Sequence, residues 1–173
     1  MAKATLKQFG APEIKIWKTI TRGTPALSSK EGLIAALKAA GREVGGHAKE
    51  IMSKSAFTVS TEEMKVDLVC ITPREAGFSK EPTFSEFIER VLSFGGLDRC
   101  APEDGALIHL EYKDQPRGEW IQIAMETIPD SDGYGDVFSV VSNDDGKSWL
   151  STDYYKPKSR LDLDCSWVFA CRN

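Results

Sequence analysis

The chain has 173 residues, of which 41% are hydrophobic and 28% are charged. This is the composition of a folded globular protein, which excludes an intrinsically disordered chain, and the length fits a single domain. No segment approaches the roughly 20 apolar residues that a membrane-spanning helix needs, and the first residues lack the apolar stretch of a secretory signal.

The net charge of −4 is unevenly distributed along the chain. Residues 1–60 carry ten basic and four acidic residues, a balance of +6, whereas residues 61–173 carry twelve basic and twenty-two acidic residues, a balance of −10. The acidic total argues against a nucleic-acid partner, and the two parts can attract each other within one fold. The four cysteines form no C-x-x-C pair, which favours free, buried thiols in a cytoplasmic protein.

The first 56 residues are expected to form a strand and a pair of helices. Residues 14–21, IKIWKTIT, alternate and are rich in strand-forming residues. Ser28 stands three residues before Glu31, the spacing of a capping box, and begins a helix that Gly41 ends. A second helix is predicted over residues 47–54. The intervening segment GREVGG is too long and too rich in glycine for a DNA-reading helix-turn-helix.

The next two predicted elements are an interior strand and an amphipathic helix. Residues 65–72, KVDLVCIT, are apolar on both faces, which is typical of a strand inside a sheet. Thr83 and Glu86 have capping-box spacing, and apolar residues follow at helical intervals from Phe84 to Leu92.

Residues 106–128 are predicted to form a central β-hairpin. Two alternating runs flank a turn that contains Pro116 and Gly118. In the expected register His109 faces Gln122 and Glu111 faces Trp120. Further strands are predicted over residues 137–141, 148–152 and 165–171.

The expected fold class is therefore α+β, with one mainly antiparallel sheet of about five to seven strands and three helices on one face. Residues 1–173 form a single domain in this interpretation. Residues 1–56 supply the strand and helical pair, residues 57–173 form most of the sheet, and residues 55–65 are a candidate hinge.

The polar face of the predicted hairpin is the candidate ligand-binding surface. A tryptophan flanked by polar residues is typical of surfaces that bind a ligand or a partner. The candidate residues are His109, Glu111, Trp120 and Gln122. The alternative interpretation is that Trp120 is covered by the aromatic loop at Tyr154 and Tyr155 or by the chain terminus.

An acidic loop at residues 129–136 is the candidate metal site. Asp130, Asp132 and Asp136 are spaced like the ligands of a calcium loop, but the position of the final bidentate glutamate is Val141. A turn stabilised by Asp and Gly is therefore preferred, with weak calcium binding or none. The two histidines and four cysteines lack the close pairs of a zinc site, and no cofactor-binding motif is present.

The sequence shows three resemblances to known protein families or motifs. Residues 142–149 match the S-x-D-x-G-x-x-W pattern of the Asp-box, which implies a structural hairpin turn and no activity. The segments VDLVCITPREAGF, GLDRCAPEDGALIHLEYKDQPRGEW and WVFACRN resemble a family of small, uncharacterised bacterial proteins. The ending LDLDCSWVFAC is similar to the last strand of C-type-lectin-like domains.

The function expected from these observations is that of a small cytoplasmic bacterial accessory or binding protein. Its partner would be a macromolecule or a small ligand held on the predicted hairpin face, with neither nucleic acid nor membrane involved. Two alternatives remain open, a small hydrolase that uses His109 with nearby carboxylates and a C-type-lectin-like ligand-binding module.

Overall fold

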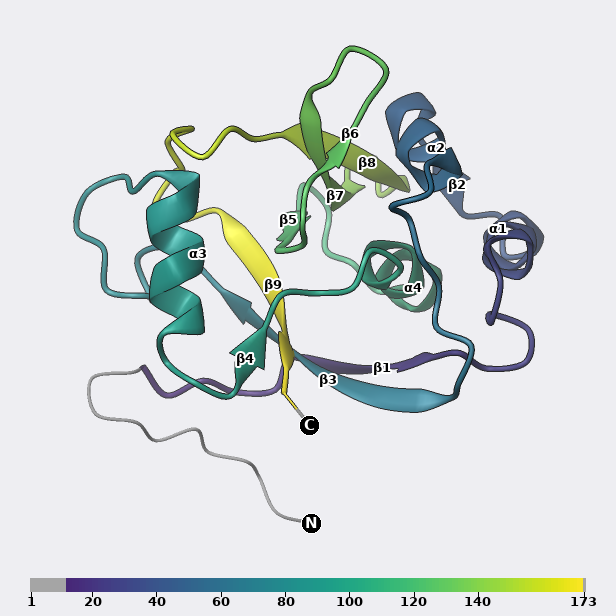
Figure 1. Cartoon of the computed structure of the whole chain (residues 1–173), viewed down its shortest axis with the longest axis horizontal. Helices are drawn as coiled ribbons and strands as arrows, with labels where there is room; N and C mark the ends of the chain where they lie inside the picture. Colours follow the sequence, from purple (N-terminus) through teal and green to yellow (C-terminus); the bar gives the residue numbers. More distant parts are fainter. Residues whose placement is uncertain (1–11, 173) are drawn as a thin grey trace.

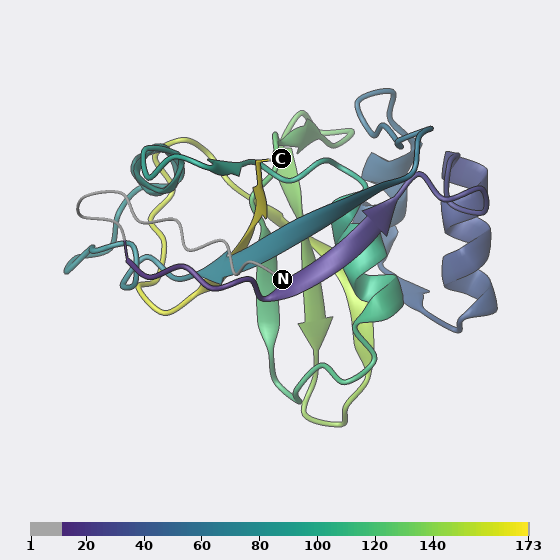
Figure 2. The ribbon, with the colours of Figure 1, turned by 90° about the horizontal axis from the view of Figure 1, so that it is seen from below.

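The computed structural model describes residues 12–172, which form four helices and nine strands. All nine strands belong to one mixed sheet that curls into a half-barrel (Figures 1 and 2). The strands are β1 (Lys18–Arg22), β2 (Glu43–Val44), β3 (Met64–Ile71), β4 (Leu97–Asp98), β5 (Trp120–Ile123), β6 (Ile128–Pro129), β7 (Gly135–Ser142), β8 (Ser148–Tyr154) and β9 (Ser166–Cys171). The helices are α1 (Lys30–Ala39), α2 (Gly46–Ser53), α3 (Phe84–Leu92) and α4 (Asp104–Glu111).

The sheet order is β1-β3-β9-β5-β7-β8-β2, with β4 beside β9 and β6 beside β7. Two of the pairings are parallel: β5 lies parallel to β9, and β2 lies parallel to β8. The expected sheet of five to seven mainly antiparallel strands was wrong in both strand number and direction, because two-residue strands such as β2 leave no periodic signal in the sequence.

Helices cover both faces of the sheet, which corrects the prediction of three helices on one face. The α3 residue Phe87 contacts the rings of Trp167 and Phe169, which lie on one face of β9. The α4 residue Gly105 packs instead against Ile123 and Phe138, on the face opposite to Trp167 because side chains alternate along a strand. Figure 1 shows α3 to the left of β9 and the other helices to its right.

The central hairpin predicted over residues 106–128 does not form, because its first arm is the helix α4. Burial explains the error: Ala106, Leu107, Ile108 and His109 are all fully buried. A helix buried on every side has no polar stripe, so its sequence lacks amphipathic periodicity. The second arm is the strand β5, whose residues Trp120 and Gln122 pair with β7 rather than with residues 106–111.

Several elements were predicted correctly. The helix α3 has the capping box of Thr83 and Glu86, and β3 lies in the sheet interior between β1 and β9. The helix α1 begins as expected, although its cap is Ser29, which accepts a hydrogen bond from the Gly32 amide, rather than Ser28. Among residues 12–172, no helix combines the length and the apolar character needed to cross a membrane.

Candidate functional site

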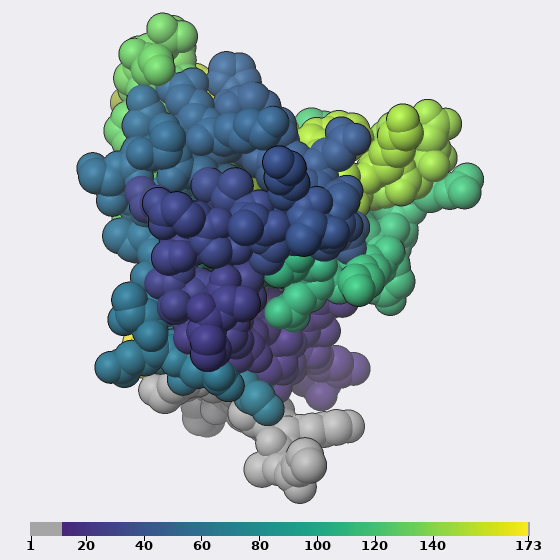
Figure 3. Space-filling view, turned by 90° about the vertical axis from the view of Figure 1, so that its right-hand side faces the viewer, coloured from purple at the N-terminus to yellow at the C-terminus, as the bar shows by residue number. Residues whose placement is uncertain are grey.

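A groove of about 620 Å³ lies between α1, α2 and β2. Figure 3 looks onto this side of the molecule, where the chain of α1 and α2 (purple to dark blue) covers the middle of the surface. Three elements contribute to it: α1, the segment that runs into β2, and α2. The lining residues are Ile34, Leu37, Lys38, Arg42, Glu43, Val44, Lys49 and Met52.

The shape of the groove follows from how α1 ends. Gly41 adopts a positive φ of 64°, and the amides of Gly41 and Arg42 bond to the carbonyls of Lys38 and Leu37. This pair of bonds is a Schellman motif, which stops the helix and turns the chain sharply. The chain then enters β2, where Val44 pairs with Leu150 of β8. One edge of the sheet therefore becomes a wall of the groove.

His109 stabilises this wall through a hydrogen bond to β2. Its Nε2 lies 2.8 Å from the carbonyl oxygen of Glu43 and donates a hydrogen bond to it. Burial lowers the pKa of His109 to about 4, and the nearby Arg42 guanidinium lowers it further, although the bond to Glu43 acts in the opposite direction. The imidazole is therefore neutral near pH 7 and serves as a fixed donor.

The chemistry of the groove is amphipathic. Leu37 and Met52 are buried at its base, and Ile34 is 49% exposed beside them. Lys38, Arg42 and Lys49 bring three cationic groups to the lining, against the single carboxylate of Glu43. A site of this kind can bury an apolar group while attracting a negative one.

The residues predicted to line a ligand surface are divided between two elements. His109 and Glu111 lie on α4, where His109 is buried and Glu111 is exposed. Trp120 and Gln122 lie on one face of β5. Trp120 is 51% exposed and its Nε1 donates to Asp153 Oδ2 at 3.0 Å, so the aromatic loop does not cover it. The structure therefore keeps Trp120 and Gln122 together and separates them from the other two.

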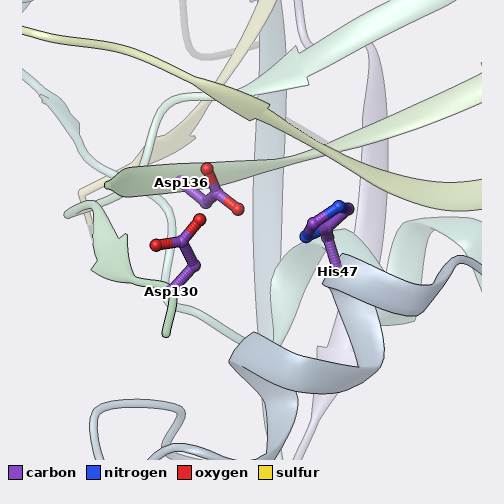
Figure 4. Close-up of side chains that lie close together, drawn as sticks. All are labelled: His47, Asp130 and Asp136. Carbon is purple, nitrogen blue, oxygen red and sulfur yellow. The ribbon is translucent and has the colours of Figure 1, made fainter. Parts of the chain in front are cut away.

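The acidic loop comes together with a residue that the sequence did not suggest. Asp130 and Asp136 lie beside His47 of α2, and their candidate ligand atoms are all within 4.8 Å of one another. Figure 4 shows the two carboxylates close together, with the imidazole approaching from α2. Asp132 is not in this cluster; its backbone amide instead donates to Asp130 Oδ1.

Sequence reasoning missed both the groove and His47 as a member of the acidic cluster. The groove joins residues from three short elements, of which β2 has only two residues. His47 is more than 80 positions from Asp130, and no local spacing links them. The one available signal was the run of basic residues before position 60, which includes Lys38, Arg42 and Lys49.

Comparisons of the chain with known protein families, curated proteins and solved structures found no match. The groove and the acidic cluster are therefore the features of this chain that bear on its function.

Proposed function

We propose that this protein is a binding protein whose groove between α1, α2 and β2 takes a small amphipathic anion. The ligand would have an alkyl or aromatic body and one carboxylate or phosphate group. The observation that carries the proposal is a lining that combines buried apolar side chains, Leu37 and Met52, with exposed cationic ones such as Lys38 and Lys49. The volume of about 620 Å³ also lies within the range of small-molecule sites.

Each part of such a ligand has a counterpart in the groove. The apolar body would cover the exposed side chain of Ile34, which gains about 25 cal/mol for each Å² removed from water. The anionic group would lie near Lys49 and Arg42, where the lining carries a net charge of about +2. The wall formed by β2 is already fixed by its pairing with β8 and by His109, so little order has to be gained on binding.

The other functions considered receive less support from the geometry. A hydrolase that uses His109 would need this imidazole at the surface next to carboxylates, but it is buried and bonded to a backbone carbonyl. The likeness to lectin-like domains rests on Cys165 and Cys171, and both are free thiols here. Free thiols fit a reducing compartment, and this supports the proposal of a cytoplasmic binding protein.

Calorimetric titration with octanoate and octyl phosphate tests the proposal, with octanol as the uncharged control. Both anions should bind, and the alcohol should bind at least about tenfold more weakly because it lacks the charge. The double variant Lys38→Glu/Lys49→Glu should weaken binding of the anions by at least about tenfold. Both lysines are exposed, so the fold should be retained.

Lys158→Glu is the matched control, since Lys158 is an exposed lysine in the loop that follows β8. It should leave the affinity within about twofold of the original. Equal weakening in the control, or equal affinity for octanol and octanoate, would exclude specific anion recognition in the groove. Binding of an acidic amphipathic peptide with no affinity for any of the small anions would replace the small ligand by a macromolecular partner.

A further inference from the structure

The cluster of His47, Asp130 and Asp136 joins three separate parts of the chain. Asp136 belongs to β7, Asp130 follows β6, and His47 is in the first turn of α2. Their candidate ligand atoms lie within 4.8 Å of one another. One imidazole and two carboxylates are a ligand set that proteins use for divalent metal ions.

The loop that carries Asp130 is fixed before any ion binds. Asp130 Oδ1 accepts hydrogen bonds from the amides of Asp132 and Tyr134, at 2.9 and 2.8 Å. Glu50 Oε1, one turn along α2 from His47, accepts from both the amide and the hydroxyl of Ser131 at 2.5 Å. The loop and α2 are thus bonded directly to each other, which keeps the imidazole near the carboxylates.

Asp136 is the buried carboxylate of the cluster. Only 5% of this residue is exposed, and the ion pairs formed within residues 12–172 include no lysine or arginine beside it. The hydroxyl of Thr152 donates a hydrogen bond to its carboxylate; among the nearby groups, Asp130 and Glu50 repel the carboxylate and His47 attracts it. A buried carboxylate is ordinarily paired with a cation or bound to a metal, because burying an unpaired charge is unfavourable.

We propose that His47, Asp130 and Asp136 bind a divalent first-row transition-metal ion, with Zn²⁺ as the reference ion. Imidazole nitrogen favours such ions over calcium, which prefers six to eight oxygen ligands. Ligand atoms about 2.1 Å from a zinc ion are about 3.4 Å apart in a tetrahedral site. The cluster therefore needs to contract by up to about 1.4 Å. The side chain of His47 is 76% exposed and can supply that movement.

Three protein ligands leave at least one coordination position for water or for a ligand from solution. This site is separate from the groove, because His47 and Glu50 lie on the opposite side of α2 from Lys49 and Met52. A negative result for the metal site would therefore leave the anion-binding proposal intact. A negative result for anion binding would likewise leave the metal-site proposal intact.

Zinc calorimetry on the full chain with a thiol-free reductant tests the site. One ion should bind per chain. Loss even of an outer-shell partner weakens metal affinity by about 10–100-fold, so His47→Gln and Asp136→Asn should each weaken zinc binding by at least about tenfold. Asp130→Asn should do the same, and it retains Oδ1 as the acceptor for the amides of Asp132 and Tyr134. The far-ultraviolet circular dichroism of each variant checks folding, and His47→Gln is a surface change that should leave the spectrum unaltered.

Asp132→Asn is the matched control, since Asp132 is an exposed aspartate in the same loop but outside the cluster. Its zinc affinity should remain within about twofold of the original. Substitution by Co²⁺ then identifies the donor atoms by visible spectroscopy, and a spectrum without thiolate charge transfer is expected. Absence of zinc binding, thiolate bands from the cysteines, or full affinity in His47→Gln would each overturn the proposal. Preferential binding of Ca²⁺ that depends on Asp132 would also overturn it and restore the loop alone as the site.

Discussion

Acidification should weaken the fold through His109, the imidazole that supports the groove. Burial holds the pKa of His109 at about 4 in the folded chain, against an ordinary value of 6.5. Between these two values the unfolded chain binds a proton that the folded chain does not. The free energy of unfolding therefore falls as the pH drops through this window, by up to about 1.4 kcal/mol for each pH unit. Above about pH 6.5 the contribution of His109 levels off.

From about pH 7 to about pH 5 the expected loss from His109 alone is about 2 kcal/mol. Urea unfolding at a series of pH values measures this loss. Carboxylates also titrate in the range, so the decisive quantity is the difference between the original chain and His109→Gln. This variant lacks the titrating group and can still donate a hydrogen bond, and it should lose about 2 kcal/mol less over the same interval.

Ile108→Ala supplies the matched control, because Ile108 is the fully buried neighbour of His109 on α4 and does not titrate. Its truncation should lower stability by about 2–5 kcal/mol at every pH, with the original pH dependence preserved. If His109→Gln retains the full pH dependence, the imidazole is not the group responsible, and its assignment as a neutral donor to Glu43 is incorrect.

Two further outcomes follow from burial. Trp120→Ala should lower the free energy of unfolding by about 1 kcal/mol or less, because Trp120 is 51% exposed. In the same urea experiment Trp167→Ala, at a fully buried position, should lower it by about 3–5 kcal/mol. Equal losses would show that Trp120 is covered in solution. Burial raises the pKa of Cys70 to about 11 and that of the fully buried Cys100 well above its usual value, so both thiols should resist alkylation at neutral pH in the folded chain. Denatured protein without reductant should show all four thiols, and a lower number would indicate a disulfide.

Sequence reasoning correctly predicted the elements whose sequence signals lie within a few neighbouring residues. The capping box of α3 lies within four residues, and its apolar stripe follows directly, so neither depends on the rest of the fold. The strand β3 was likewise recognisable from apolar residues on both faces. The predictions that failed concern elements whose conformation depends on tertiary packing. Residues 104–109 of α4 are buried, and the alternation of apolar and polar residues from Ile108 to Glu111 resembles that of a strand.

A local signal for α4 was nevertheless present. Pro102, Glu103 and Asp104 precede the apolar run, and a proline followed by acidic residues is typical of a helix start. The Asp104 carboxylate accepts a hydrogen bond from the Ala101 amide and also pairs with Arg22 through bonds of 2.7 and 2.6 Å. The first interaction is local and could be anticipated, but the second joins positions 82 residues apart and could not.

The candidate sites show why a short, polar helix can be central to this fold. The helix α2 has only eight residues and no side-chain cap, so it would be marginal in isolation. With about 100° between successive residues, Ala48 and Ile51 face the core, Lys49 and Met52 face the groove, and His47 and Glu50 face the acidic loop. Three different surroundings thus stabilise three faces of one helix. Hydrophobic periodicity records the buried residues Ala48, Ile51 and Met52, so it reveals that α2 exists but not what His47, Lys49 and Glu50 contact.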